Sequence, residues 1–244
     1  MCEKNDGVRN MLVCFEWDSK KYCVLVDRAF NTRLTTLTVP RDTILDGELM
    51  PDDTYLVYDA VLIRGENLMR KPLDERLGLA KKMCSIILRT PKNPVVRVKP
   101  MFPLSEMSRV LETMSDKSDG IIFTPVAEPI RMGTHETLFK WKPRQHITID
   151  FLIRPTGEFI QRGVQGVETV YGMYIADRDR LVYIMPCKNG AQYNDKIVEC
   201  AYGDCGWQII KVRADKTYPN NKRTYERTIV NIREDIQPEE FLCV

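Results

Sequence analysis

The alternation of apolar and polar residues in the first part of the chain predicts a series of strands. Strand-like runs occupy residues 8–16, 22–27, 43–50 and 55–63. A polar stretch at 17–21 separates the first two runs, which is the pattern of a hairpin. Asp59 lies in the middle of the last run, and an aspartate inside an apolar strand is costly unless it is paired or bound. We therefore expect Asp59 to be either a buried hydrogen-bonding hub or a site residue.

The period of the pattern changes after residue 71 and indicates a helix over residues 72–88. Pro72 precedes it, and Asp74 and Glu75 fall in its first turn, where acidic side chains are favourable. The apolar positions that fall on one face are Leu73, Leu77, Ala80, Cys84, Ile87 and Leu88. A short strand at 95–98 and a second helix at 105–114 are expected among the prolines that follow.

Three further strands are predicted before residue 153, at 119–123, 137–143 and 147–152. The second of these alternates apolar and basic residues, so Lys140 and Lys142 are expected on one face of a strand.

From about residue 153 the pattern consists of short strands separated by glycine, aspartate and asparagine. These strands are expected at 170–175, 181–185, 197–201 and 207–212, with a helix after Tyr225. Short strands at this spacing favour a small barrel or sandwich. We therefore place a domain boundary between residues 152 and 153, which gives domains 1–152 and 153–244.

Composition narrows the class of protein. The 244 residues are 43% apolar and 29% charged, as in ordinary globular proteins, and the net charge of +2 argues against a nucleic-acid binder that relies on a global basic field. No apolar run approaches the roughly 20 residues that span a bilayer, so we expect no membrane association. The eight cysteines include no Cys-x-x-Cys pair and predict free thiols in a reducing, intracellular compartment.

Charged residues recur at a glycine or within an apolar run in five separate segments. They are Lys4 and Asp6, Glu48, Asp59, Asp119, and Lys140 with Lys142. By itself Lys4-Asn5-Asp6-Gly7 is more often a solvated turn than a site. Five such segments together indicate charges that converge on one cleft.

The residue types at this cleft define its chemistry. Lys140 and Lys142 suit an anion such as a phosphate. Glu48 and Asp119 offer the oxygen ligands that Mg²⁺ or Mn²⁺ prefers. A lysine among other cations has a depressed pKa and can then act as a neutral nucleophile. The residues predict a phosphate-handling site with a lysine nucleophile and a metal, and they leave the nucleotide open.

An ordered set of motifs resembles one known superfamily, the covalent nucleotidyltransferases, which comprise polynucleotide ligases and the guanylyltransferases of mRNA capping enzymes. The motifs are Lys4-Asn5-Asp6-Gly7, Leu45-Asp46-Gly47-Glu48-Leu49, Tyr58-Asp59-Ala60, Asp119-Gly120-Ile121-Ile122-Phe123, Lys140-Trp141-Lys142-Pro143, and Trp207 followed by Arg213, Asp215, Lys216, Pro219 and Asn220. The capping branch is the most similar, because Pro72-Leu73-Asp74-Glu75-Arg76-Leu77 and Thr148-Ile149-Asp150-Phe151 resemble its helix start and its strand after the Trp-Lys-Pro motif.

The resemblance implies an α+β fold. A nucleotidyltransferase domain of ATP-grasp-like antiparallel sheets would be followed by an OB-fold β-barrel domain. It implies an mRNA guanylyltransferase that forms a lysyl-N-GMP intermediate from GTP with Mg²⁺ or Mn²⁺ and passes GMP to the 5′-diphosphate end of RNA. RNA triphosphatase and cap methyltransferase domains or subunits would be its partners.

The resemblance also implies a role for each site residue. Lys4 would be the nucleophile, and Lys140 and Lys142 would hold the α-phosphate. Arg9 and Glu48 would contact the ribose or organise the metal, Tyr58 would stack on guanine, and Asp119 would bind the metal. Asp150, Arg213, Asp215 and Lys216 would contact the leaving phosphates, with a hinge at 151–157. Asp46 is expected to be structural.

Other interpretations stay open at this point. Lys140 and Lys142 can be a solvated strand face, Tyr58 plain core, and Arg213 and Lys216 surface charge. Relatives carry several strands and a helix before the nucleophile, so we expect the first domain to be N-terminally incomplete, with an exposed edge at Lys4. The alternative functions are an ATP-dependent polynucleotide ligase and a non-catalytic RNA-binding remnant.

Overall fold

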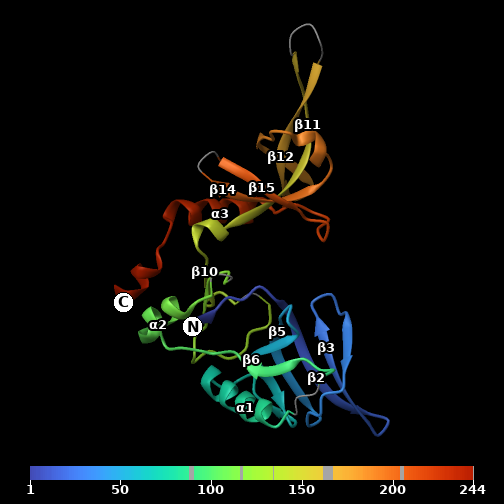
Figure 1. Ribbon diagram of the computed structural model, residues 1–244, viewed down its shortest axis with the longest axis vertical. Coiled ribbons are helices and arrows are strands. Elements are labelled where there is room, and N and C mark those ends of the chain that lie inside the picture. Colours follow the sequence, from blue (N-terminus) through green and yellow to red (C-terminus); the bar gives the residue numbers. More distant parts are fainter. Residues whose placement is uncertain (88–90, 116–117, 134, 162–166, 204–205, 244) are drawn as a thin grey trace. The chain divides into compact units, whose positions relative to one another are not determined.

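The computed structural model describes residues 1–87, 91–115, 118–133, 135–161, 167–203 and 206–243. The chain forms two compact units, Met1–Trp141 and Lys142–Val244. Figure 1 shows the first unit in blue to green and the second in yellow to red. Within the described residues, no helix has both the length and the apolar character needed to cross a membrane.

A seven-stranded sheet forms most of the first unit, in the order β4-β3-β2-β5-β6-β7 with β8 beside β6. The strands are β2 (Val8–Trp17), β3 (Lys20–Asp27), β4 (Thr32–Thr35), β5 (Thr43–Leu49), β6 (Thr54–Ile63), β7 (Glu66–Asn67) and β8 (Val95–Val98). All neighbours pair antiparallel except β6 and β8, which are parallel. The strands expected from the alternation are present. The short strands β4 and β7 were not predicted, because two to four residues are too few to show a period.

One face of this sheet is the core of the first unit, and α1 (Leu73–Ser85) covers it at β6 and β8 (Figure 1). Leu12, Leu45 and Val57 are fully buried there. The buried stripe of α1 is Leu73, Arg76, Ala80 and Met83, so an arginine takes the place on this face that the apolar pattern gave to Leu77. The helix ends at Ser85, earlier than predicted, and Leu88 lies outside the described residues.

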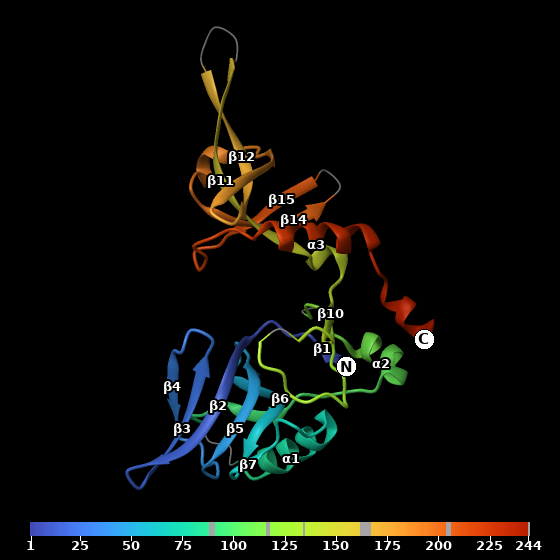
Figure 2. The same cartoon turned by 180° about the vertical axis from the view of Figure 1, so that it is seen from behind.

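A second, three-stranded sheet has the order β1-β9-β10. Its strands are β1 (Cys2–Glu3), β9 (Ile121–Phe123) and β10 (Phe139–Trp141), and the labels β1 and β10 mark it in Figure 2. The 3₁₀ helix η1 (Leu104–Glu106) and α2 (Met107–Thr113) precede β9, where one helix was predicted. β10 is shorter than the predicted strand at 137–143, so Lys142 lies beyond its end.

The second unit is a five-stranded antiparallel sheet in the order β13-β12-β11-β14-β15. Its strands are β11 (Thr148–Gln161), β12 (Val167–Asp177), β13 (Arg180–Pro186), β14 (Ile197–Gly203) and β15 (Gly206–Val212). Its helices are α3 (Lys222–Glu234) and the 3₁₀ helices η2 (Arg144–His146), η3 (Gly190–Tyr193) and η4 (Pro238–Cys243).

Aromatic residues fill the core of the second unit. Phe151 is fully buried, and its ring centroid lies 5.3 Å from that of Trp207 in an edge-on contact. Tyr225 and Ile232 of α3 pack into the same core, so the helix closes one side of the sheet. Asn221 caps α3 by accepting a hydrogen bond from the Thr224 backbone N–H at 2.8 Å.

The strand β11 bears on the predicted domain boundary and hinge. It begins at Thr148 and lies wholly in the second unit, whereas the predicted boundary at 152/153 would divide it. Residues 151–157 pair with β14 as far as Leu152 and with β12 as far as Pro155. A paired strand with a fully buried Phe151 is a poor hinge, so the structure gives no support for a hinge at this position.

Candidate functional site

The backbone of Lys4 is held by the segment 118–120. The Lys4 N–H donates to the Gly120 carbonyl at 2.7 Å, and the Lys4 carbonyl accepts from the Asp119 N–H at 2.8 Å and from Ser118 Oγ at 3.2 Å. The Lys4 ammonium contacts the Asp119 carboxylate, and the two side chains are 19% and 22% exposed. Lys4 is therefore a positioned, mostly covered side chain and not a solvated turn residue. The adjacent strand β1, which ends at Glu3, lies at the edge of the small sheet.

Two glycines near Lys4 are required by close packing. A Cβ on Gly7 would lie 2.7 Å from Glu48 Cγ and 2.8 Å from the Leu49 carbonyl oxygen. A Cβ on Gly47 would lie 2.6 Å from the Tyr55 ring. Real Cβ atoms do not approach so closely, so only glycine lets the Lys4 segment and β5 pack at this distance.

A cavity of about 640 Å³ opens beside Lys4. It draws its lining from both sheets of the first unit and includes Lys4, Arg9, Glu48, Tyr58 and Lys140. Its volume falls in the range of sites for nucleotide-sized ligands. The structure therefore brings five of the predicted site residues to one cavity within the first unit.

Arg9 and Tyr58 share one carboxylate at the wall of this cavity. Arg9 forms a two-point contact with Asp46, with Nε–Oδ1 at 3.0 Å and NH2–Oδ2 at 2.5 Å. The Tyr58 hydroxyl donates to Asp46 Oδ1 at 2.8 Å. Burial, together with the charge of Asp46, raises the pKa of Tyr58, so its hydroxyl stays protonated as a donor. Asp46, expected to be structural, holds both side chains in place.

Glu48 contacts both the segment that carries Lys4 and a buried lysine, Lys99. Its Oε1 accepts from the Gly7 N–H at 3.2 Å, and its Oε2 lies 3.4 Å from Lys99 Nζ. The Lys99 side chain is only 3% exposed and also lines the cavity. The sequence analysis missed Lys99. The available signal was a lysine directly after the apolar run 95–98, because lysines are rarely buried without a partner.

Asp59 pairs with Arg76 of α1, as expected of a hydrogen-bonding hub, and it also lines the cavity. Arg76 Nε and NH2 lie 2.7 and 3.0 Å from the two Asp59 oxygens, and the arginine side chain is 3% exposed. Arg76 NH1 also donates to the carbonyls of Lys71 and Glu128. The missed signal was an arginine three residues after Leu73, on the apolar face of the helix.

Arg76 thereby anchors residues 124–133, here called the strap, which lines one side of the cavity. The strap is also held by the Leu73 N–H, which donates to the Val126 carbonyl at 2.8 Å, and by its own Ile130 N–H, which donates to Met69 at 2.8 Å. The position of the cavity wall therefore depends on the buried Asp59–Arg76 pair.

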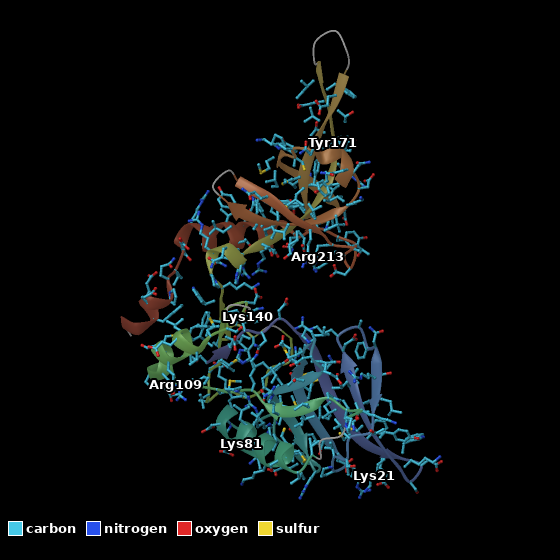
Figure 3. All side chains as sticks on the ribbon, viewed as in Figure 1. Lys21, Lys81, Arg109, Lys140, Tyr171 and Arg213 are labelled. Atoms are coloured by element: carbon cyan, nitrogen blue, oxygen red, sulfur yellow. The ribbon has the colours of Figure 1, made fainter. Side chains whose placement is uncertain are left out.

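The two lysines of the Trp-Lys-Pro motif are placed differently from the prediction. Lys140 is on β10, pairs in register with Ile122, and lines the cavity. It is labelled in Figure 3. Lys142 lies beyond the strand end and belongs to the second unit. The expected arrangement of both lysines on one strand is wrong, because β10 ends at Trp141 and Lys142 is not part of it. A phosphate-binding role for Lys142 stays a prediction.

The other predicted phosphate-binding residues form one charged cluster in the second unit. Arg213, labelled in Figure 3 just after β15, contacts Asp215 with Nε–Oδ1 at 2.8 Å and NH2–Oδ2 at 2.7 Å. Its NH1 lies 3.1 Å from Asp150 Oδ1 and 3.5 Å from Glu199 Oε2. Lys216 Nζ is 3.7 Å from Asp150 Oδ2. The structure thus brings together all four residues that the resemblance assigned to the leaving phosphates.

Arg213 and two of its carboxylate neighbours, Asp215 and Glu199, have shifted pKa values. Asp215 holds the pKa of Arg213 above its ordinary value, and Arg213 holds the pKa of Asp215 below its ordinary value. Burial alone would raise the pKa of Glu199, but hydrogen bonds from Thr148 and Lys211 bring it below the ordinary value. Arg213, Asp215 and Glu199 are therefore charged at neutral pH.

Asn220 fixes the loop that carries Arg213 and Lys216. The Asn220 side chain accepts from the Asp150 N–H at 2.8 Å, and its own N–H donates to the Asp150 carbonyl at 2.8 Å. The Asn220 carbonyl accepts from the Ala176 N–H at 3.0 Å. These hydrogen bonds attach the loop to β11 and β12. This assigns a structural reason to the asparagine of the final motif.

The predicted metal ligands do not form a preassembled metal cage. Asp119 is paired with Lys4 and Glu48 with Lys99. Among the residues that the structure describes, no three His, Cys, Asp or Glu side chains gather to hold a metal ion. Mg²⁺ often binds through one or two carboxylates together with substrate phosphates, and a single Asp119 beside the nucleophile fits that mode.

Comparison with solved structures gives the class of this fold. A mycobacterial DNA ligase D, determined with ATP and MES, superimposes with a TM-score of 0.51 at 13% identity and covers 88% of each chain. At this identity the similarity shows the fold alone. The fold is that of a nucleotidyltransferase followed by an OB-type domain, which confirms the predicted fold class.

Family models define the relationship more closely. The model described as "mRNA capping enzyme, catalytic domain" matches residues 1–144, and "mRNA capping enzyme, C-terminal domain" matches residues 134–242. The chain belongs to the mRNA capping enzyme family.

Two relatives illustrate the match. The mRNA-capping enzyme subunit alpha of Schizosaccharomyces pombe is 26% identical, over 99% of this chain and 73% of its own length. The mRNA-capping enzyme of Danio rerio is 28% identical, over 82% of this chain and 37% of its own length. The chain therefore spans well under half of the zebrafish protein. The predicted family and enzyme class are confirmed, and the family matches favour capping over the ligase alternative.

Proposed function

We propose that this chain is an mRNA guanylyltransferase, with Lys4 as the covalent nucleophile and GTP as the nucleotide. The observation that supports the proposal most directly is the position of Lys4, which is held by its backbone at the mouth of a nucleotide-sized cavity beside Asp119. Membership of the capping family supports GTP as the substrate over ATP.

In the first step the Lys4 amine attacks the α-phosphorus of GTP. A bond forms between Nζ and phosphorus, the bond to the bridging oxygen breaks, and pyrophosphate leaves with its electron pair. The amine must first lose its proton to solvent, which exposes its lone pair. The product is a lysyl-N-GMP phosphoramidate.

In the second step a terminal phosphate oxygen of a 5′-diphosphate RNA attacks the same phosphorus. The bond to Nζ breaks, and Lys4 recovers its proton and its starting state. The product carries GMP joined to the RNA through a triphosphate bridge, which is the 5′ cap structure. Lys140, on the cavity wall, offers a cation to the α-phosphate in both steps.

The remaining residues have binding roles in this proposal. Tyr58 lies on the cavity wall with its hydroxyl fixed by Asp46, so its ring offers a flat surface to the guanine. Arg9 and Glu48 stand near the ribose. Arg213 and Lys216 offer cations to the pyrophosphate part of GTP, with Asp215 and Asp150 as the carboxylates that such an anion would displace.

A divalent cation completes the proposed chemistry. Asp119 would hold Mg²⁺ or Mn²⁺ together with phosphate oxygens, with Glu48 as a second carboxylate. When bound, the ion would neutralise charge that develops on the phosphates. RNA triphosphatase and cap methyltransferase activities would come from other domains or subunits. From the cysteine content we propose a reducing, intracellular location. The resemblance to capping enzymes implies the nucleus or a viral cytoplasmic factory.

The test is covalent labelling. GTP labelled at the α-phosphate, with Mn²⁺, is expected to label the denatured chain, and Lys4→Ala is expected to remove the label completely because no other amine occupies its position. Lys81→Ala is the matched control, because Lys81 lies on the exposed side of α1. Label that persists in Lys4→Ala would disprove the nucleophile.

The ligase alternative is separated in the same experiment. ATP labelled at the α-phosphate is expected to give no adduct under conditions in which GTP does. An adduct from ATP alone would replace the guanylyltransferase proposal with that of a ligase.

A further inference from the structure

The turn between β3 and β4 lies at the same end of the large sheet as the nucleophile. β2 begins at Val8, shortly after Lys4, and the register pairs Asn10 with Asp27, the last residue of β3. The turn that follows Asp27 therefore stands beside the Lys4 segment. Asp27, Arg28 and Ala29 of this turn line the cavity that contains Lys4.

This turn holds a phenylalanine out in solvent. Phe30 is 83% exposed, and its φ of 62° lies in the left-handed region, where a bulky residue is strained. The Asp27 carboxylate keeps the turn in this form by accepting from the backbone N–H groups of Ala29 and Asn31 at 2.8 and 2.9 Å. The hydrogen bonds of the Asp27 carboxylate are thus made within the turn, while Phe30 and Arg28 are exposed.

The strap has a similar pair of residues at the same cavity, an arginine next to an exposed apolar side chain. Arg131 and Gly133 line the cavity, and Met132 between them is 85% exposed. Met132 and Phe30 are the two most exposed large apolar side chains in the described part of the chain. Both lie beside an arginine that lines the same cavity, and Gly133, with φ of 86°, shapes the strap at this point.

We propose that Arg28 and Phe30 of the β3–β4 turn, with Arg131 and Met132 of the strap at the same cavity, bind the first nucleotides of the acceptor RNA. The proposal rests on the proposed guanylyltransferase function. The 5′-diphosphate must reach the Lys4-bound GMP, so the nucleotides next to it lie at the rim of the cavity. An exposed aromatic ring stacks on any base, and the arginines pair with backbone phosphates. Such a contact accepts RNA without reading its sequence.

The experiment measures the two half-reactions separately in the full chain. The first is formation of the labelled adduct from GTP, and the second is transfer of the label to a 5′-diphosphate oligoribonucleotide. Phe30→Ala is expected to lower the transfer rate relative to adduct formation by about 5-fold to 100-fold, which is the usual effect of removing one stacking aromatic. Phe30→Tyr keeps the ring and is expected to restore the ratio.

Trp17→Ala is the matched control. Trp17 is also an exposed aromatic of the same sheet, 72% exposed, but it lies at the opposite end of β2. Its removal is expected to change the ratio less than twofold. An equal loss for Trp17→Ala and Phe30→Ala would show a general effect on the sheet and overturn the proposal.

An acceptor without a first base tests the stacking directly. With a 5′-diphosphate RNA whose first nucleotide is abasic, the wild-type chain is expected to lose about as much transfer as Phe30→Ala loses with normal RNA. The two losses are not expected to multiply when combined. Multiplicative losses, or a Phe30→Ala defect in adduct formation equal to that in transfer, would contradict base stacking by Phe30.

Direct binding separates this inference from the proposed function. If the wild-type chain forms no adduct, the proposed function fails, and fluorescence anisotropy with the same oligoribonucleotide still tests the turn. Arg28→Gln is expected to lower the slope of log affinity against log salt by about 0.7, because one phosphate contact is lost. Unchanged RNA affinity in both Phe30→Ala and Arg28→Gln would overturn the inference.

Discussion

The two units of the chain hold their charges in opposite ways. In the first unit, Arg76 and Lys99 are each 3% exposed and each faces one carboxylate. In the second unit, Arg213 is 21% exposed and is shared by three carboxylates, of which Asp215 is 65% exposed. The first arrangement leaves the cations no room to exchange partners, whereas the second leaves one side of the arginine open to water.

This difference in burial distinguishes ion pairs that hold the structure in place from ion pairs that can exchange a partner for a ligand. A buried, bidentate pair keeps its geometry because breaking it leaves an uncompensated charge in a poorly solvated place. Arg213 has one partner at the surface, Asp215, and it can exchange this exposed carboxylate for a phosphate oxygen at little cost. We therefore expect the buried pairs to stabilise the cavity of the first unit and the exposed cluster to act on the ligand.

The largest expected effect is the loss of a buried pair in the first unit. Arg76→Met leaves the Asp59 carboxylate without its partner and releases the strap at the Glu128 carbonyl, so we expect a loss of about 3 to 5 kcal/mol in the free energy of unfolding. Urea denaturation of the full chain measures the loss, and amide hydrogen exchange is expected to locate it in α1 and β6.

A double variant distinguishes a lost pair from a lost side chain. Arg76→Met combined with Asp59→Leu removes both charges, and we expect it to recover most of the stability because an apolar pair of similar volume often replaces a buried ion pair. If the double variant is as unstable as the single one, the arginine contributes by its contacts to carbonyls and not by its charge.

A smaller loss of stability, together with a loss of activity, is expected for Arg213→Ala. We propose that Arg213 contacts the leaving phosphates, and its removal is expected to slow adduct formation with GTP by roughly 100-fold to 1,000-fold. The loss of stability should be smaller than for Arg76→Met, because Lys216 remains beside Asp150 and Lys211 beside Glu199. Single-turnover labelling measures the rate. A stability loss as large as that of Arg76→Met would erase the contrast between the two units.

The smallest effect is expected for Asp215→Asn. The change frees Arg213 from its two-point carboxylate partner, so inhibition of adduct formation by pyrophosphate should strengthen, by at most about fivefold. Arg213 depresses the pKa of Asp215, so this carboxylate is charged from neutral pH down to acidic pH. The difference between variant and wild type is therefore expected to be flat above pH 5 and to vanish only in stronger acid, as Asp215 becomes protonated. A difference that vanishes near neutral pH would assign the effect to another group.

The sequence predicted the strands of both units because their signals are local. Alternating runs located β2, β3, β5 and β6. The ordered motifs selected Lys4, Tyr58 and Lys140, which the structure brings to one cavity, and Arg213, which it places in the charged cluster.

The features that the sequence did not predict depend on tertiary contacts. Lys99 and Arg76 are understandable only when Glu48 and Asp59 are placed opposite them. Lys142 was assigned to a strand that stops one residue before it. The sequence around Phe30 does not show that its side chain is exposed. The turn is held by hydrogen bonds to the Asp27 carboxylate, and these are known only from the structure.

The clamp on Lys4 has a consequence for the synthesis of the protein. The hydrogen bonds of its backbone and the contact of its ammonium all go to residues 118–120, 115 positions downstream in the case of Asp119. The Lys4 segment leaves the ribosome more than one hundred residues before its partners. Contacts of such high sequence separation form late and slowly. A nascent chain should therefore remain unable to react with GTP until β9 has joined β1, so covalent labelling of stalled nascent chains reports the completion of folding.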